Sequence, residues 1–220
     1  MTKFYQSVTT DIVIFTIADE QLKVLLIKRA NEPFKNQWAL PGGFLFEKED
    51  PDKAAIRTLW TKAGIKDVYL EQLYTFGGSG RDPRGKIITI SYFALSPQDK
   101  IKIVVSDKIQ TPTFRSVKKL PDIAFDHNRI ITYALQRLQS KLEYTNAVYS
   151  LLPHYFTFNQ LQRTYEIILN KKLDKRNFRK KFILLVLIKQ TRKVLKGERQ
   201  RPAKLYQFIS RKPAELKKFF

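Results

Sequence analysis

The first 120 residues arrange apolar and polar positions in short runs that are typical of strands. Residues 11–17 (DIVIFTI) and 22–29 (LKVLLIKR) are apolar, β-branched runs on either side of ADEQ, which predicts a β-hairpin. Residues 86–95 alternate with a period of two, and shorter runs at 101–105 and 111–117 predict further strands. This part of the chain therefore predicts a β-rich domain.

One helix interrupts these strands, at residues 51–63. Asp50 or Asp52 supplies an N-cap acceptor beside Pro51, a residue that suits the first turn, and Gly64 is a natural C-cap. Strands before and after a single central helix favour an α+β fold over a doubly wound parallel sheet.

The pattern becomes helical in the rest of the chain. Residues 127–142 predict an amphipathic helix with Asp126 as its N-cap. We interpret residues 123–144 as a connector between one domain at 1–122 and a second domain at 145–220.

The second domain has the element order of a winged helix-turn-helix. Residues 158–170 predict a helix that ends at Asn170, and Asp174 caps another helix with a basic first half and an apolar second half. Its apolar run FILLVLI, at 182–188, is expected to be the buried side of that helix. Two short strands around a turn at Gly197 follow, so the order is helix, turn, helix and hairpin. The expected core face of the second helix is Phe178, Phe182, Leu185 and Val186.

The net charge of +21 is concentrated in this second part. Residues 1–140 carry 21 Lys and Arg against 15 Asp and Glu, whereas residues 141–220 carry 20 against 5. Such an asymmetric excess predicts a surface for a polyanion, and nucleic acid is the first candidate.

The basic half of the second helix is where a recognition helix meets the major groove. Arg and Asn there are suited to guanine and adenine edges, and the hairpin is placed to run along phosphates as a wing. The alternative is that the charge run is only a solvated helix face, although it lacks the interspersed acids that such a face usually carries. The expected DNA-binding residues are Lys175, Arg176, Asn177, Arg179, Lys180 and Lys181 on the helix, and Arg192, Lys193, Lys196, Arg199, Arg201 and Lys204 on the hairpin.

Composition excludes several other classes of protein. The chain has no cysteine, which removes disulfides, thiolate metal sites and cysteine nucleophiles. It shows no targeting segment, and its longest late apolar run has seven residues where a bilayer span needs about 20. We therefore expect a soluble, cytoplasmic protein with no membrane partner. His127 and His154 are isolated from each other and are interpreted as structural residues.

Residues 42–65 carry a spaced motif. Gly43, Glu49, Arg57, Leu59, Gly64 and Ile65, preceded by WALPGG, match the box of the Nudix hydrolases at its spacings. The segment departs from that box where the family has three glutamates, because Thr58, Thr61 and Lys62 stand there. Three carboxylates at these i, i+3 and i+4 positions would hold Mg²⁺ against a pyrophosphate, whereas threonine is a weak ligand and lysine adds positive charge. We expect a Nudix fold, a mixed sheet with flanking helices, that is not an enzyme and holds no metal.

A degenerate Nudix domain followed by a winged helix resembles the bacterial Nudix-related transcriptional regulators, often called NrtR-like. The resemblance covers nearly the whole chain, including EQLYTFG with RDPRG, LLPHYFTFNQLQ, LDKRNFRKK and RQRPAKLYQF. It implies a homodimer whose winged helices bind a palindromic operator and whose N-terminal domain senses ADP-ribose or a related NAD metabolite, with no cofactor.

The resemblance also implies an effector pocket. Arg29 and Arg81 are expected to contact phosphate or ribose, and Lys62 to neutralise a ligand phosphate in place of the lost metal. Two of the expected pocket residues have structural alternatives. Trp38 is equally compatible with a core position, and Arg57 with a salt bridge to Glu49. The expected effector-binding residues are Arg29, Trp38, Phe44, Glu49, Arg57, Lys62 and Arg81.

Three other functions remain open from the sequence. Members of the same family sense sugars such as arabinose, and a nucleotide and a sugar cannot be distinguished from the loop residues alone. An active ADP-ribose pyrophosphatase would need the glutamates that are replaced. A constitutive RNA-binding or architectural protein would show no preference for operator over non-specific duplex.

Overall fold

The computed structural model describes residues 7–66, 68–101, 109–195 and 202–216. The chain divides into two compact units, residues 1–136 and 137–220, and the division falls inside helix α2 (His127–Lys141). The expected domain bounds, with residues 123–144 as a separate connector, stay a prediction.

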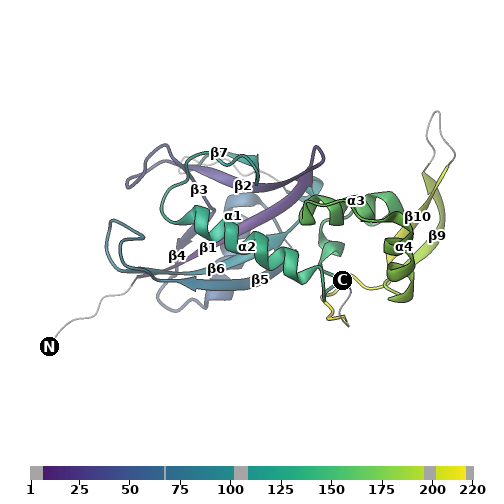
Figure 1. Ribbon diagram of the computed structural model, residues 1–220. Helices are drawn as coiled ribbons and strands as arrows, with labels where there is room; N and C mark the ends of the chain where they lie inside the picture. Colours follow the sequence, from purple (N-terminus) through teal and green to yellow (C-terminus); the bar gives the residue numbers. More distant parts are fainter. Residues whose placement is uncertain (1–6, 67, 102–108, 196–201, 217–220) are drawn as a thin grey trace. The chain divides into compact units, whose positions relative to one another are not determined.

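The first unit is built on one mixed, seven-stranded sheet (Figure 1). β1 (Ser7–Ala18) and β2 (Gln21–Arg29) form the expected antiparallel hairpin, whereas β1 and β6 (Ile87–Leu95) pair in parallel. The main path runs β3-β2-β1-β6-β5, with β4 on β1 and β7 on β2. The other strands are β3 (Trp38–Ala39), β4 (Gly42–Phe44), β5 (Tyr69–Phe76) and β7 (Ile109–Ser116), and η1 (Gln98–Lys100) is a short 3-10 helix. The strand expected at 101–105 lies almost wholly outside the described residues.

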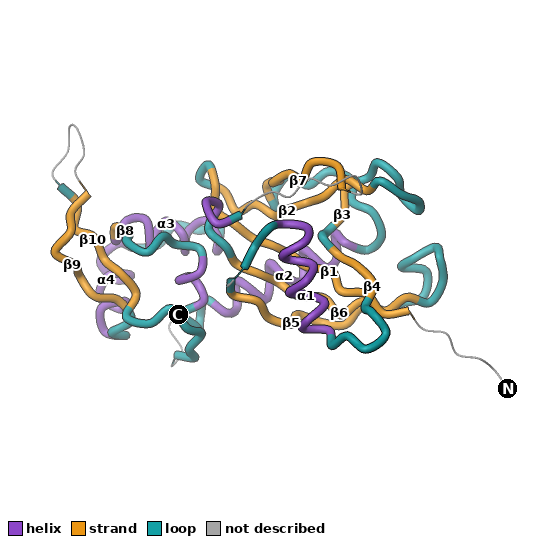
Figure 2. Tube along the Cα trace, turned by 180° about the vertical axis from the view of Figure 1, so that it is seen from behind, coloured by secondary structure: helices purple, strands orange, loops and turns teal. Residues whose placement is uncertain are grey.

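Helix α1 (Pro51–Ala63) covers one face of this sheet, and the first turns of α2 lie on the other (Figures 1 and 2). Pro51 starts α1, and Gly64 ends it with a left-handed φ of 62°, as expected. The expected N-cap acceptor is wrong, because the Asp50 side chain makes no cap hydrogen bond and the Asp52 carboxylate accepts from the Tyr92 hydroxyl instead. α1 buries Ala55, Leu59 and Ala63 against Ile12 and Ile14 of β1. The alternation along β1 thus places its even-numbered apolar residues under α1.

The second unit has the expected order of helix, helix and hairpin. After η2 (Ala147–Ser150) and β8 (Phe156–Thr157), helices α3 (Phe158–Leu169) and α4 (Lys175–Leu184) precede β9 (Ile188–Leu195) and β10 (Ala203–Phe208). The sheet order is β8-β10-β9. α3 begins with a capping box and ends at the left-handed Asn170, and the Asp174 carboxylate accepts a hydrogen bond from the Asn177 N–H at 2.8 Å.

The core of this unit is aromatic. Phe158 and Tyr165 of α3 pack edge-on against Phe178 of α4, with ring centroids 5.8 and 5.3 Å apart, and Tyr206 of β10 contacts Phe158 at 5.8 Å. The side-chain amide of Gln139, near the end of α2, donates to the Ile168 carbonyl of α3 at 2.8 Å.

The expectation for residues 182–188 is wrong. α4 ends at Leu184, Leu185 is its C-cap residue, and Val186 adopts a left-handed φ of 51°. Phe178 and Phe182 are buried as expected, but Val186 is 70% exposed. Because β9 starts only two residues later, this apolar run spans a helix end, a turn and a strand start instead of one buried helix face.

Candidate functional site

A small pocket of about 120 Å³ opens in the first unit where β1, β4, the loop between β5 and β6, and the start of α2 meet. Its location at the ends of strands is common for ligand sites. Its polar and aromatic lining residues are Thr9, Asp11, Arg29, Phe44, Arg81, Asp82, Arg84, Phe125 and His127.

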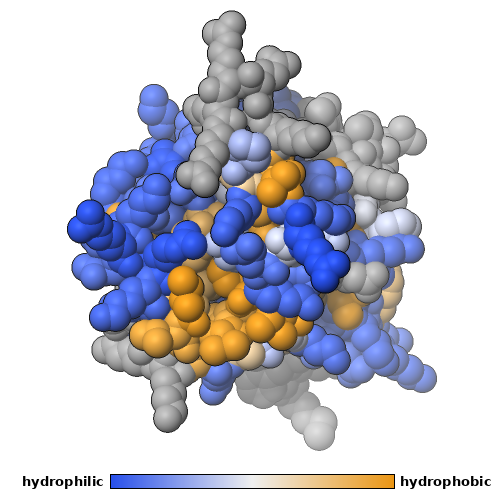
Figure 3. Space-filling view, turned by 90° about the vertical axis from the view of Figure 1, so that its right-hand side faces the viewer, coloured by the Kyte–Doolittle hydropathy of each residue, from blue (hydrophilic) through white to orange (hydrophobic). Residues whose placement is uncertain are grey.

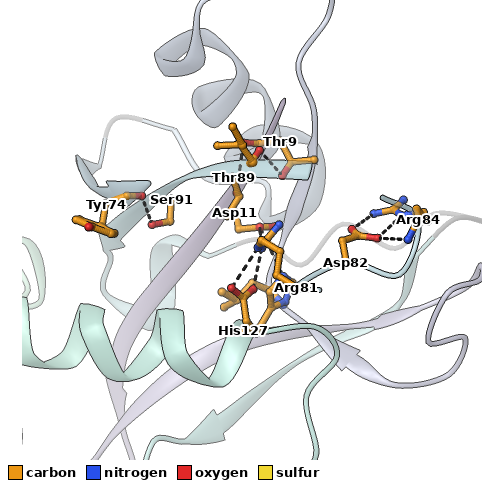
Figure 4. A network of polar contacts seen from close by, with 12 residues as sticks. Thr9, Asp11, Tyr74, Arg81, Asp82, Arg84, Thr89, Ser91 and His127 are labelled. Atoms are coloured by element: carbon orange, nitrogen blue, oxygen red, sulfur yellow. Dashed lines mark hydrogen bonds and ion pairs between the residues drawn. The ribbon is translucent and has the colours of Figure 1, made fainter. Parts of the chain in front are cut away.

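A buried ionic network forms the base of this pocket (Figure 4). The Arg81 guanidinium donates to both carboxylate oxygens of Asp126, at 2.8 and 3.1 Å, and lies 3.6 Å from the Asp11 carboxylate. The backbone N–H of Leu40 donates to Nδ1 of His127 at 2.9 Å, and His127 Nε2 lies 3.6 Å from Asp11. The Arg81 side chain is only 5% exposed, and its guanidinium is engaged in these ion pairs. Its expected ligand contact stays a prediction.

Asp11 keeps its charge in this network. Burial raises the pKa of its carboxyl group, but His127, Thr89 and Arg81 act in the opposite direction, and the net result is a lowered pKa. The same carboxylate explains the glycine at position 42, since a Cβ there would lie 2.1 Å from Asp11 Oδ1.

Two arginines and two phenylalanines form the outer wall. The Arg29 guanidinium lies 4.7 Å from the ring centroid of Phe125, and Arg84 lies 5.1 Å from Phe44 and 5.6 Å from Phe125. Burial lowers the pKa of Arg29, and the nearby positive charge of Arg84 lowers it further. Arg84 is oriented by a bidentate pair with Asp82, at 2.7 and 2.9 Å. The wall therefore presents positive charge and aromatic faces, which suits an anion attached to a planar ring.

The Glu49–Arg57 pair lies beside this pocket. Arg57 donates to both carboxylate oxygens of Glu49 at 2.7 Å, and to the Phe44 carbonyl at 3.1 Å. These hydrogen bonds from Arg57, opposed by burial and helped by the Phe46 N–H, lower the pKa of Glu49 to about 2. Phe44 and Glu49 also line a neighbouring hollow of about 400 Å³. The pair is thus the salt bridge that was one interpretation of Arg57.

The three positions that replace the family's glutamates do not form a cation site. Thr58 is 1% exposed, and the Thr61 hydroxyl donates to the Arg57 carbonyl at 2.8 Å. Lys62 is half-buried on α1. Within the described part of the chain, no group of three or more His, Asp or Glu side chains is placed to hold a metal ion.

The structure brings together some of the expected effector residues and separates others. Arg29, Phe44 and Arg81 line the 120 Å³ pocket, and Glu49 lines the hollow next to it. Arg57 lies between the two, because it donates hydrogen bonds to Glu49 and to the carbonyl of Phe44, which lines both. Trp38 and Lys62 line neither of them. Trp38 is half-buried in β3, and the guanidinium carbon of Arg115 lies 5.1 Å from its ring centroid.

Sequence reasoning missed Arg84, Asp82, Asp11 and Phe125 as pocket residues. The charged loop RDPRG was a signal for Asp82 and Arg84, since two arginines and an aspartate surround one proline. Phe125 carried no such signal, because its left-handed φ of 58° turns the ring toward Arg29.

The second unit carries the expected basic surface. All six predicted residues of α4, from Lys175 to Lys181, are exposed, as are Arg192, Lys193 and Lys204 of the hairpin. Arg179 packs across the unit, because its guanidinium donates to the Tyr206 hydroxyl at 3.0 Å and lies 4.8 Å from the Phe158 ring. Lys196, Arg199 and Arg201 lie outside the described residues.

An acidic residue holds the turn before α4. The Glu166 carboxylate accepts from the Leu173 N–H at 3.1 Å and from the Gln162 amide at 3.2 Å. Burial raises the pKa of Glu166, but these hydrogen bonds and Lys172 outweigh it, so the pKa is lowered. The charged carboxylate therefore fixes where α4 begins relative to α3.

An apolar patch follows the basic residues. Ile183, Leu184 and Val186 are 54, 72 and 70% exposed at the end of α4. Figure 3, seen from the α4 and β9 side of Figure 1, shows apolar side chains gathered among hydrophilic ones. None of the helices in the described ranges has the length and apolar content to cross a bilayer.

Comparison with known proteins matches both units. Residues 8–134 match the model of the NUDIX domain, and residues 148–208 match the NrtR DNA-binding winged helix domain. The chain is 41% identical over 206 residues to the ADPR responsive transcriptional repressor NtrR of Acinetobacter baylyi, a match covering 91% of this chain and 81% of the relative. It is 35% identical over 115 residues to an ADP-ribose pyrophosphatase of Methanocaldococcus jannaschii, covering 52% and 67%.

Solved structures of Shewanella oneidensis NrtR match as well. The complex with a 27mer DNA superposes with a TM-score of 0.81 at 36% identity, covering 91% of this chain and 93% of that one. Its Nudix domain in complex with ADP ribose matches with a TM-score of 0.56 at 38% identity, covering 62% and 90%. The chain therefore belongs to the NrtR family of Nudix-related transcriptional regulators, in which a Nudix domain precedes an NrtR DNA-binding winged helix domain.

Proposed function

We propose that this protein is a transcriptional repressor that binds operator DNA through its winged helix and responds to ADP-ribose through its Nudix domain. The observation that carries the proposal is the combination, in one chain, of an arginine and phenylalanine pocket in the first unit with an exposed basic helix in the second. The names of the A. baylyi relative and of the S. oneidensis complexes support it.

The lining of the pocket suits ADP-ribose better than a neutral sugar, although its volume of about 120 Å³ has room for only part of that ligand. Arg29 and Arg84 place two guanidinium groups beside the rings of Phe44 and Phe125. A pyrophosphate can accept from the guanidinium groups while an adenine stacks on a phenylalanine ring. Arabinose carries neither an anionic group nor a flat ring and would leave both features unused.

On this proposal the protein does not hydrolyse its ligand. The Nudix fold implies Mg²⁺, but the residues present do not fit the ion. Both oxygens of Glu49 accept from Arg57, Thr58 is buried, and the Thr61 hydroxyl is directed to the Arg57 carbonyl. The pairing of Glu49 with Arg57 instead supports a structural role, in which the pair holds the Phe44 backbone at the pocket.

On the DNA side, we assign base contacts to the N-terminal half of α4 and phosphate contacts to the hairpin. Lys175, Arg176 and Asn177 occupy the first turn, where a recognition helix enters the major groove. Arg192 and Lys204 lie on the paired strands β9 and β10. A homodimer is part of the proposal, since the two half-sites of a palindromic operator are bound by two copies of the same winged helix.

Two variants separate the two activities. Operator duplexes would be selected from a random pool, and binding measured by fluorescence anisotropy at fixed salt with ADP-ribose, NAD or arabinose present. We expect ADP-ribose to weaken operator binding by about tenfold, within the usual range of coupling between sites. Arg84→Met is expected to keep operator affinity and lose the response, whereas Arg176→Ala is expected to lose operator affinity and still bind ADP-ribose.

Other outcomes support other functions. A response to arabinose alone would favour the sugar-sensing alternative. A ratio of operator to non-specific affinity near one would favour an architectural protein. Release of AMP from ADP-ribose and Mg²⁺ at a rate of about 1 s⁻¹ or more would establish a hydrolase.

A further inference from the structure

A third and larger hollow lies on the first unit, between the outer face of α1 and the start of β5. Its volume is about 1000 Å³, which is in the range of small-molecule sites. We call it the α1 groove. Its apolar lining comes from Ile56, Leu59, Trp60, Ile65, Val68 and Leu70.

The apolar stripe of the α1 groove is on the opposite side of α1 from Thr58, one of the three positions of the family's glutamates. Successive helix residues are about 100° apart, so Ile56 and Trp60 lie roughly 160° from Thr58 on the helix circumference. Thr58 is 1% exposed, whereas Ile56 and Trp60 are 58 and 48% exposed. The groove lining includes none of Thr58, Thr61 and Lys62, and it shares Arg57 with the Nudix box.

Two large apolar side chains are left open to solvent in this groove. Ile56 and Trp60 are four residues apart, so they form a continuous stripe on α1. Below them, Leu59 and Ile65 are 3 and 2% exposed and close the base of the groove. An apolar stripe over a concave base favours an occupant with an apolar body.

The charged lining residues select the sign of that occupant's charge. Lys53, Arg57 and Lys66 carry positive charge. Lys53 is paired with Asp50 at 3.2 Å and Arg57 with Glu49, and the Lys66 ammonium lies 3.8 Å from the Trp60 ring centroid. The one acidic lining residue, Asp52, has a carboxylate oxygen that accepts from the Tyr92 hydroxyl at 2.5 Å. The groove thus places positive charge directly beside its apolar stripe.

We propose that the α1 groove binds a small amphipathic anion, with an apolar chain or ring on Ile56 and Trp60 and a carboxylate or phosphate at Lys53 and Lys66. A second copy of the chain is a poorer occupant, because a two-fold contact across this face brings the same lysines together. The site is additional to the ADP-ribose pocket and does not depend on it.

Trp60 provides the test. The chain has two tryptophans, so in a Trp38→Phe background Trp60 is the sole indole. Decanoate, decanol and decylammonium would be titrated below their micelle concentrations against the full-length protein while indole emission is recorded. Decanoate is expected to shift the emission saturably, with a Kd at least about tenfold below that of decylammonium. An equal response to the two ions, or no saturable shift, would overturn the proposal.

Three variants control the assignment. Lys66→Gln is expected to weaken decanoate binding about threefold or more with decanol unchanged, and Ile56→Asp to abolish it. Ile183→Asp, which alters a similarly exposed isoleucine in the other unit, is expected to leave decanoate binding unchanged. Displacement of decanoate by ADP-ribose would assign the groove to the effector site instead. Dissociation of the native oligomer by Trp60→Ser, measured by sedimentation equilibrium, would make it a subunit interface.

Discussion

Replacing Arg81 with methionine tests the ionic network at the base of the pocket. The substitution keeps most of the apolar stem and removes the guanidinium, which donates to both oxygens of Asp126 and lies 3.6 Å from Asp11. The Arg81 and Asp11 side chains are 5 and 10% exposed, so water does not replace the lost partner well. Asp11 would keep His127 and Thr89 as partners, whereas Asp126 would lose both hydrogen bonds from the guanidinium.

The magnitude follows from the cost of breaking a buried ion pair. Removing one partner from such a pair costs roughly 3–5 kcal/mol. Because Asp126 is 19% exposed, the low end applies, and we expect the free energy of unfolding of the first unit to fall by about 3 kcal/mol. Arg115→Met is the matched control, since it removes an exposed guanidinium that stacks on Trp38, and it should cost about 1 kcal/mol or less.

Urea unfolding followed by tryptophan fluorescence measures this loss. Both tryptophans, Trp38 and Trp60, lie in the first unit, so the signal reports that unit alone. The folded pKa of Asp11 is lowered, so its charge stabilises the wild type above the unfolded pKa of about 3.9, and this contribution is lost as the pH falls through the folded pKa. The deficit of the Arg81 variant should therefore be largest near pH 7 and should shrink below about pH 4, where the Asp11 carboxyl group becomes protonated.

The outcome that would refute this reasoning is a loss of less than about 1 kcal/mol at pH 7, or a deficit that grows on acidification. Either result would mean that Asp11 and Asp126 are solvated or rearranged after the change. A loss equal to that of Arg115→Met would lead to the same conclusion.

Three further predictions concern the second unit. Glu166→Ala removes the acceptor of the Leu173 N–H and should destabilise the start of α4 by about 1–2 kcal/mol, measured by amide hydrogen exchange; unchanged protection would contradict its role in the turn. Val186→Asn should raise the free energy of unfolding by about 1 kcal/mol, because valine is strained at a φ of 51° and its side chain is 70% exposed; a lower melting temperature by circular dichroism would contradict this. Lys180→Ala should reduce the slope of log Kd against log salt concentration by about 1 for operator duplex, and an unchanged slope would exclude a phosphate contact.

The elements that sequence predicted well are those whose ends carry local signals. Gly64 and Asn170 end their helices in left-handed conformations, and Asp174 caps α4 with its side chain. Each of these signals depends on a few neighbouring residues, so no tertiary information is needed to recognise it. The mixed sheet and the winged helix were predicted from such element boundaries together with the family resemblance.

The run at 182–188 shows where such reasoning is insufficient. Ile, Leu and Val are compatible with a buried helix face and with a strand, and periodicity does not separate the two in a run of seven residues. In the structure the core of this unit is filled by the rings of Phe158, Tyr165, Phe178 and Tyr206. Leu184 and Val186 therefore have no place in it.

The pocket was only partly predictable for a related reason. Arg29 and Arg81 are visible as charged residues next to strands, but their different surroundings depend on the fold. Arg81 is buried because Asp126, 45 positions away, comes to lie beside it. The Arg29 guanidinium contacts the Phe125 ring in the same way, across 96 positions. Long-range proximity of this kind has no signature within a short stretch of sequence.

Helix α2 is shared by the two units of the chain. Its first residues, next to Asp126, form part of the pocket base, and Gln139 near its other end donates to the Ile168 carbonyl of α3. The boundary between the two units falls inside this helix of 15 residues, so one continuous element supplies residues to the pocket base of the first unit and to the helical core of the second.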